Sequence, residues 1–210
     1  MTFHPAVLNE AQKTLLPALG KFAADNGFSL GGGTAVALYL GHRSSIDFDW
    51  FLTGPLEDSL GLAEQARMRG LSIASLQVAP GTLHAVIQNV RVSFFQYLYP
   101  CLEEPTVWPE YGIKVASLDD LSCMKLAAIA QRGSRKDFID LYFIALRHKP
   151  LQTLFDLYRR KYAIDDITHL LLGLAYFDDA DEEPSPLLLL EASWEAIKDQ
   201  FREWVKPFAP

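Results

Sequence analysis

Hydrophobic and polar residues follow two different patterns along this chain of 210 residues, and the change between them falls near residue 100. Before it, some segments carry apolar residues at every second position, as β-strands do, and others at every third or fourth position, as helices do. After residue 112 the helical pattern dominates. We therefore expect an α+β fold, with a mixed sheet and helices in residues 1–112 and a helical half in residues 113–210.

The first half is expected to open with a helix over residues 5–25, kinked or broken at Pro17 because proline cannot donate a backbone hydrogen bond. Further helices are expected over 34–40 and 57–69. The predicted strands cover residues 28–30, 46–52, 71–79, 83–88 and 90–98, and the last three form a meander. Prolines at 100, 105 and 109 predict a loop over 99–112.

The second half is expected to be built from helices over residues 118–132, 135–148, 151–162, 165–177 and 188–205. Ser117 and Ser134 are suitable N-caps for the first two of these helices, and Gly133 ends the first. The acidic run from Asp178 to Glu183 precedes Pro184, and we expect it to form a solvated loop.

Composition is that of a globular protein able to bury a sizeable core, with 50% hydrophobic and 21% charged residues. Cys101 and Cys123 lack the spacing of a metal site, and the first residues lack the basic and then apolar pattern of a signal peptide. The aliphatic run from Leu187 to Leu190 is far shorter than the roughly 20 residues that cross a bilayer. We expect a cytoplasmic protein without a membrane role.

A glycine-rich turn is the first candidate for chemistry. Gly31, Gly32 and Gly33 lie between a predicted strand and a predicted helix that begins near Thr34. Glycines permit a tight turn, and the unpaired N–H groups and partial positive charge of a helix N-terminus favour an anion such as a triphosphate. The Thr34 hydroxyl is a further possible donor. Alone, such a run is more often only a turn.

Asp47 and Asp49 are the second candidate. In a strand they share one face while Ile46, Phe48 and Trp50 share the other. Their Cα atoms would lie about 7 Å apart, which lets both carboxylates share a hard cation such as Mg²⁺. An isolated Asp-x-Asp is commonly just part of the solvent-exposed face of an edge strand. The two candidates together favour nucleotide chemistry.

These motifs resemble a known family. Gly32–Gly33–Thr34 followed by Asp47–Phe48–Asp49 is similar to the signature of the DNA polymerase beta-like nucleotidyltransferases. With Lys125–Leu126, Ala128 and the segment from Arg135 to Leu141, the chain more narrowly resembles the AbiEii-type abortive-infection nucleotidyltransferases, some of which are toxins of toxin–antitoxin pairs. The resemblance covers roughly residues 28–147.

The resemblance implies a nucleotidyltransferase-like fold and a role for each matching residue. Nucleotide phosphates would be bound at the glycine turn, and Lys125 would lie near the triphosphate. The implied catalytic residues are Asp47, Asp49, Lys125, Asp137 and Asp140; the implied nucleotide-binding residues are Gly32, Gly33, Thr34, Arg43 and Lys125; and the implied metal ligands are Asp47 and Asp49. Mg²⁺ would be the cofactor, with Mn²⁺ as a possible substitute, and an NTP the substrate.

Structural alternatives exist for the second group. Asp137 and Asp140 share a helix face and could instead be first-turn acids paired with basic residues at 132, 135 or 136. Lys125 could extend along an apolar helix into solvent, and Arg43 could be a surface arginine.

One strand departs from the pattern of the superfamily, which commonly places a third carboxylate on a later strand. The strand over residues 90–97 contains no acid, and Arg91, Ser93 and Phe95 share one of its faces. A third metal ligand must therefore come from elsewhere, such as Asp137 or Asp140, or be absent.

The sequence thus predicts a metal-dependent nucleotidyltransferase that moves an NMP from an NTP to a macromolecular acceptor. By resemblance the acceptor would be RNA, such as a tRNA end, or a protein side chain, and a separately encoded antitoxin is possible. The net charge of −7 argues against broad nucleic-acid binding, although basic clusters occur in the helical half. Two alternatives remain: a non-catalytic binding module with this fold, and an Asp-x-Asp glycosyltransferase.

Overall fold

The computed structural model describes residues 2–208. Within them the strands form one sheet of seven, in the order β3-β4-β5-β2-β1-β7-β6. The strands are β1 (Ser29–Gly31), β2 (Asp47–Thr53), β3 (Ile73–Ala79), β4 (Thr82–Ile87), β5 (Val90–Tyr97), β6 (Thr106–Trp108) and β7 (Ile113–Val115). The expected loop over 99–112 therefore contains β6, and β7 joins the sheet from beyond residue 112.

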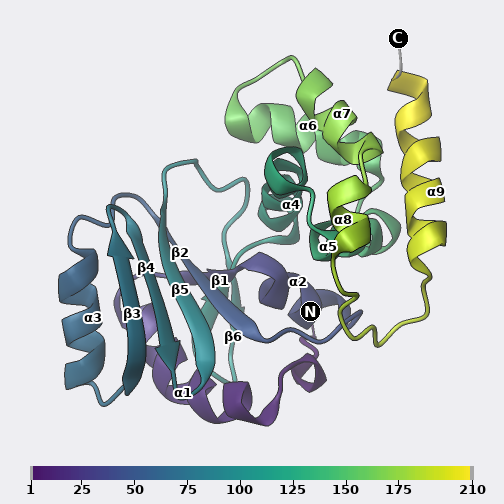
Figure 1. Cartoon of the computed structure of the whole chain (residues 1–210). Helices are drawn as coiled ribbons and strands as arrows, with labels where there is room; N and C mark the ends of the chain where they lie inside the picture. Colours follow the sequence, from purple (N-terminus) through teal and green to yellow (C-terminus); the bar gives the residue numbers. More distant parts are fainter. Residues whose placement is uncertain (1, 209–210) are drawn as a thin grey trace.

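The helices gather mainly on one side of the sheet (Figure 1), which confirms the α+β prediction. They are α1 (Glu10–Asp25), α2 (Gly32–Leu40), α3 (Ser59–Met68), α4 (Leu118–Arg132), α5 (Arg135–Arg147), α6 (Leu151–Tyr162), α7 (Thr168–Ala175), α8 (Asp178–Glu182) and α9 (Trp194–Val205), with 3-10 turns at Pro5–Val7 and Lys206–Phe208.

The sheet is mixed. Strands β3, β4 and β5 form the expected antiparallel meander, while β5 and β2 are parallel and β2 and β1 antiparallel. The β2–β5 register pairs Asp47 with Arg91 and Asp49 with Ser93. Because side chains alternate along a strand, these four side chains lie on the same face of the sheet.

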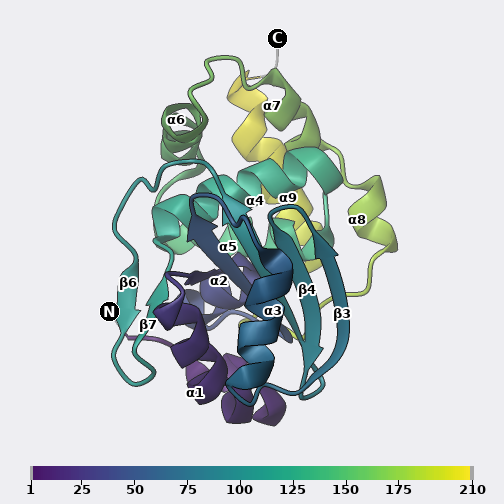
Figure 2. The same cartoon turned by 90° about the vertical axis from the view of Figure 1, so that its left-hand side faces the viewer.

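The opposite face of the sheet is the core. Phe48, Trp50 and Phe94 are fully buried there, and helices α1 and α3 cover this face (Figure 2). Phe22 of α1 packs edge-on against Phe94, with the ring centroids 5.9 Å apart. Burying each such side chain stabilises the fold by about 1.5–3 kcal/mol. Helices α2, α4 and α5 lie on the side of the opposite, polar face of the sheet.

Helix α2 connects the two halves. It is buried from Thr34 to Leu40 and contacts both α4 and α5 as well as β2. Ser117 caps α4 as expected, accepting a hydrogen bond from the Asp120 N–H. Gly133 ends α4 with a φ of +58°, a conformation that favours glycine.

Two predictions near the start of the chain differ in part from the structure. Helix α1 continues through Pro17 and is not broken there, and Leu15, Leu16 and Leu19 are fully buried on both sides of the proline. Ile46 does not belong to the apolar face of β2, since the strand begins at Asp47 and Ile46 is 56% exposed.

The final helix starts later than expected, at Trp194 rather than residue 188. Residues 187–190 instead run alongside the segment that precedes β2. The Leu187 carbonyl accepts from the Ser44 N–H at 2.9 Å, and the Leu189 N–H donates to the His42 carbonyl at 2.8 Å. Because residues 187–190 make these hydrogen bonds with a distant segment, they are extended and not helical. We call this run the strap, since it links the end of the helical half to the segment before β2.

The acidic run is not the solvated loop that its composition predicts. Residues 178–182 form α8, and Lys198 donates to Asp181 at 3.0 Å. Glu183 accepts from the Ser134 hydroxyl (2.6 Å) and from the Arg135 N–H (2.9 Å), so Glu183 and not Ser134 satisfies the N-terminus of α5. A carboxylate suits this position because the helix dipole is positive there.

We therefore expect Glu183→Ala to lower the free energy of unfolding by about 1 kcal/mol, the usual value of a helix N-cap. Urea denaturation of the two proteins measures the change. Glu182→Ala is the matched control, because Glu182 is exposed and makes no ion pair within residues 2–208. Equal stability of the two variants would contradict the capping role.

Candidate active site

A cavity of about 530 Å³ lies between the polar face of the sheet and helices α4 and α5. Most residues that the sequence marked for chemistry line it, and they come from both halves of the chain. These are Gly32, Gly33, Thr34, Arg43, Asp47, Asp49, Lys125 and Asp137. Asp140 is fully buried behind the cavity wall.

The glycine turn lies directly against the charged residues. Gly32 has a φ of +63°, and a Cβ at this position would collide with the Asp49 carboxylate. A Cβ at Gly33 would collide with the Arg43 guanidinium. Glycine at both positions therefore lets the start of α2 lie against the Asp49 carboxylate and the Arg43 guanidinium. The first N–H groups of α2 have no hydrogen-bond partner inside the helix.

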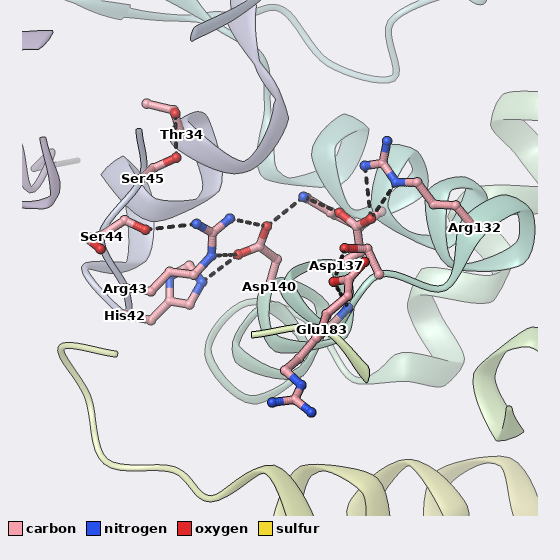
Figure 3. Close-up of polar contacts among 12 residues, drawn as sticks. Thr34, His42, Arg43, Ser44, Ser45, Arg132, Asp137, Asp140 and Glu183 are labelled. Carbon is pink, nitrogen blue, oxygen red and sulfur yellow. Dashed lines mark hydrogen bonds and ion pairs between the residues drawn. The ribbon is translucent and has the colours of Figure 1, made fainter. Parts of the chain in front are cut away.

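Thr34 differs in one respect from its expected role. Its side chain is nearly fully buried, and its hydroxyl donates to the Asp47 carbonyl oxygen and lies 2.7 Å from the Ser45 hydroxyl (Figure 3). The hydroxyl proton is thus used to tie α2 to the start of β2. At the cavity, Thr34 offers its backbone N–H.

The Asp pair shares the polar face of β2 as predicted from its spacing. Asp47 accepts from Nε of Arg91 at 2.8 Å, across the β2–β5 register. Asp49 makes no ion pair within residues 2–208. Burial raises the pKa of Asp49, although the nearby Lys125 ammonium acts in the opposite direction.

A divalent cation fits this pair. A half-buried carboxylate without an ion-pair partner, as Asp49 is within residues 2–208, carries uncompensated charge, and two carboxylates together offer the oxygen ligands that Mg²⁺ prefers. Among residues 2–208, however, no group of three or more Asp, Glu, His or Cys side chains is arranged to hold a metal. Ser93 occupies the position opposite Asp49 on β5. The described chain therefore supplies two carboxylates and no third.

Behind the pair lies a chain of alternating charges, which we call the charge network: Arg43, Asp140, Lys125, Asp137 and Arg132. Lys125 Nζ lies 2.7 Å from Asp137 Oδ1 and 2.6 Å from Asp140 Oδ2. Arg43 donates to both oxygens of Asp140, at 2.6 and 2.8 Å (Figure 3). Arg132 donates to Asp137 at 2.9 Å.

The charge network excludes the surface positions that the sequence left open for Arg43 and Lys125. Arg43 is buried, so it is not a surface arginine, and Lys125 does not extend into solvent. Asp137 pairs with Arg132, as the structural alternative supposed, and also with Lys125. Because both oxygens of Asp140 are bound to cations, Asp140 does not supply the missing metal ligand.

Asp140 also binds His42, whose Nε2 lies 2.8 Å from Oδ1 (Figure 3). Burial lowers the pKa of His42, although the hydrogen bond to Asp140 opposes this. A neutral ring with its proton on Nε2 can donate to the carboxylate. Although burial raises the pKa of Asp140, Arg43 and Lys125 hold it well below its usual range.

Sequence reasoning missed two partners in the site, His42 and Arg91, whereas Arg132 was named as a possible partner of Asp137. Arg91 was placed on the correct face of its strand, but the alternation of side chains does not tell which strand pairs with which. Of the three basic residues considered as partners for Asp137, at 132, 135 and 136, the structure pairs it with Arg132.

Comparison with known proteins bears on this arrangement. The family described as "Nucleotidyl transferase AbiEii toxin, Type IV TA system" matches residues 81–208. The chain belongs to the AbiEii nucleotidyltransferase family. The matched segment contains Lys125, Asp137 and Asp140, whereas the glycine turn and the Asp pair precede it.

Other proteins resemble most of the chain. An uncharacterised protein of Aquifex aeolicus (strain VF5), aq_aa25, is 37% identical over 204 residues, or 96% of this chain and 97% of the relative. MenT4, a nucleotidyltransferase toxin from Mycobacterium tuberculosis H37Rv, has a similar structure (TM-score 0.62, 16% identity, 93% of this chain and 82% of that one). JHP933 from Helicobacter pylori is also similar (TM-score 0.55, 16% identity, 95% and 92%).

The AbiEii protein is thus a nucleotidyltransferase, and its fold is shared with other nucleotidyltransferases. The resemblance stated from the sequence motifs is confirmed. No helix within residues 2–208 combines the length and the apolar character that crossing a membrane requires.

The charge network predicts a pH-dependent contribution to stability. Asp140→Asn leaves Arg43 and Lys125 short of a buried partner, and we expect unfolding free energy to fall by about 3–5 kcal/mol at neutral pH. The folded pKa of Asp140 lies below its value of 3.8 in the unfolded chain, so the carboxylate stabilises the fold above that pH. The difference between wild type and variant should therefore shrink as pH falls below 3.8.

Denaturant unfolding at several pH values measures this difference. Asp156→Asn is the control, because Asp156 is 65% exposed in its pair with Arg159 and such pairs contribute about 1 kcal/mol or less. A difference between wild type and the Asp140→Asn variant that stays constant down to acidic pH would contradict the argument.

Proposed function

We propose that this AbiEii protein transfers an NMP from an NTP to a macromolecular acceptor, with a divalent metal, and releases pyrophosphate. The supporting observation is that the glycine turn, the Asp pair and Lys125 line one cavity although they come from three separate segments of the chain. A phosphate cradle, a pair of metal-binding carboxylates and a fixed cation are what this reaction needs.

The triphosphate would bind at the start of α2. The N–H groups of Gly33 and Thr34 are available to its oxygens, and Arg43 lies beside Gly33. Lys125 has three N–H donors, of which Asp137 and Asp140 take two, so one remains for the leaving pyrophosphate. The network holds one more cation than carboxylates when His42 is neutral, which favours an anionic ligand.

Asp47 and Asp49 would hold Mg²⁺, with Mn²⁺ as a substitute. When bound there, the cation supplies charge neutralisation at the phosphates and acidifies or orients the attacking hydroxyl. Arg91 now neutralises Asp47, and its side chain is 66% exposed. An exposed arginine can swing away at small cost, so Arg91 would release Asp47 to the cation.

The acceptor would be RNA, such as a tRNA end, or a protein side chain. Arg91, Arg132 and Lys136 are exposed and line the cavity, although the chain carries a net charge of −7. A basic entrance on an otherwise acidic protein favours a polyanionic acceptor over a neutral one. Family membership further supports a toxin that is paired with a separately encoded antitoxin and acts in the cytoplasm.

The test is transfer of label from each of four α-³²P-labelled NTPs, with Mg²⁺, to total RNA and to protein extract in separate reactions. We expect one acceptor pool to be labelled, and Asp49→Asn to lower the rate by at least about 100-fold, the effect of losing a few kcal/mol of charge stabilisation. Chelation with EDTA should abolish transfer, and Mn²⁺ should restore it.

Asp199→Asn is the control, since Asp199 is 72% exposed and its one ion pair within residues 2–208 is with Arg202 at the surface. Wild type that labels neither pool, and binds no NTP in the presence of Mg²⁺, would favour the non-catalytic binding module, to which the serine opposite Asp49 lends some support. Sugar transfer from a UDP-sugar would favour the glycosyltransferase.

A further inference from the structure

One end of the cavity is apolar, in contrast to the charged end around Arg91. Phe51 of β2 and Phe95 of β5 are paired in the sheet register, and their rings stack with centroids 5.2 Å apart and planes 25° from parallel. Both rings are half-buried and line the cavity. The charge network described above does not involve either ring.

Helix α4 forms the facing wall. Leu121, Met124 and Ala128 line the same cavity and recur at three- and four-residue spacing, so they share one helix face with Lys125. The cavity therefore has an apolar slot between a stacked aromatic pair and an aliphatic helix face. A flat, weakly polar group fits such a slot.

The apolar slot adjoins the phosphate cradle. Phe51 follows Asp49 by two residues on the same face of β2, and a Cβ at Gly31 would collide with the Phe51 ring. Gly31 is the residue from which α2 starts. A ligand with phosphates at the start of α2 would therefore have the slot within reach on one side.

The basic side chains lie on the other side of the Asp pair. Along β5 the open face presents Arg91 first, then Ser93 opposite Asp49, and then Phe95. Arg91 is thus separated from Phe95 by the position of the metal pair. The apolar end of the cavity therefore suits a group attached to the triphosphate, and the basic end suits the acceptor.

We propose that the apolar slot binds the nucleobase of the NTP, which stacks on the Phe51–Phe95 pair and against Met124. The inference rests on the proposed function and adds the site for the base. Stacking of a base on an aromatic side chain typically changes affinity by roughly 5- to 150-fold. Phe51 and Phe95 would then determine nucleotide affinity without touching the reacting phosphorus.

The experiment compares binding of NTP and of inorganic tripolyphosphate, each with Mg²⁺, by titration calorimetry. The NTP used is the one that wild type binds most tightly. We expect Phe95→Leu to weaken NTP binding at least about 10-fold and to leave tripolyphosphate binding within about twofold, because only the NTP carries a base. Phe95→Tyr should keep wild-type affinity. Phe51→Leu and Phe51→Tyr give the same comparison if Phe95→Leu lowers the melting temperature.

Tyr99→Leu is the control, because Tyr99 is 47% exposed and its ring packs in a tilted contact against Tyr97 just beyond β5, and Tyr99 does not line the cavity. Unchanged NTP binding by Phe95→Leu, or an equal loss for both ligands, would overturn the proposal. Unchanged NTP affinity with a raised KM for the acceptor in the labelling reaction would assign the slot to an acceptor base and also overturn it. If wild type binds every NTP no more tightly than tripolyphosphate, the proposal for the apolar slot is wrong while the proposed function stands. If it binds neither ligand, the proposed function is wrong as well.

Discussion

Buried charge is the constraint on which the site depends. Asp140 has no exposed surface, and its desolvated carboxylate is compatible with the fold only because Arg43, Lys125 and His42 surround it. These partners come from the segment before β2 and from α4, while Asp140 itself belongs to α5. The same interaction that satisfies one carboxylate therefore fixes the two walls of the cavity relative to each other. Lys125 and Arg43 are thus held in position by the fold itself, through Asp137 and Asp140.

The sequence predicted those parts of the protein that are encoded locally. The glycine turn, the shared face of Asp47 and Asp49, and the shared face of Asp137 and Asp140 all follow from the periods of strands and helices. The meander and most helix positions follow from the same periods. The resemblance of motifs then named the correct family, because the chemistry of the reaction restricts which residue types can stand at those positions.

What the sequence did not reveal are interactions between distant segments. Glu183 caps a helix that begins 48 residues earlier, and Arg91 pairs with Asp47 across 44 residues. The spacing of apolar residues does not predict these contacts, because the contacts depend on which strands and helices become neighbours in the fold. Ile46 and the run from Leu187 to Leu190 were misassigned for the same reason: an apolar residue indicates burial or pairing, but the partner is supplied by the tertiary fold.

The strap formed by residues 187–190 has a consequence for how the protein is made. Its backbone bonds to His42 and Ser44 hold the segment that carries Arg43. A ribosome synthesises the glycine turn and the Asp pair early, and the strap after every member of the charge network. A nascent chain thus carries the glycine turn and the Asp pair long before the strap that holds the segment around Arg43 has left the exit tunnel. For an enzyme of a toxin family, this order of synthesis delays completion of the site until residues 187–190 have been made and have paired with the segment before β2.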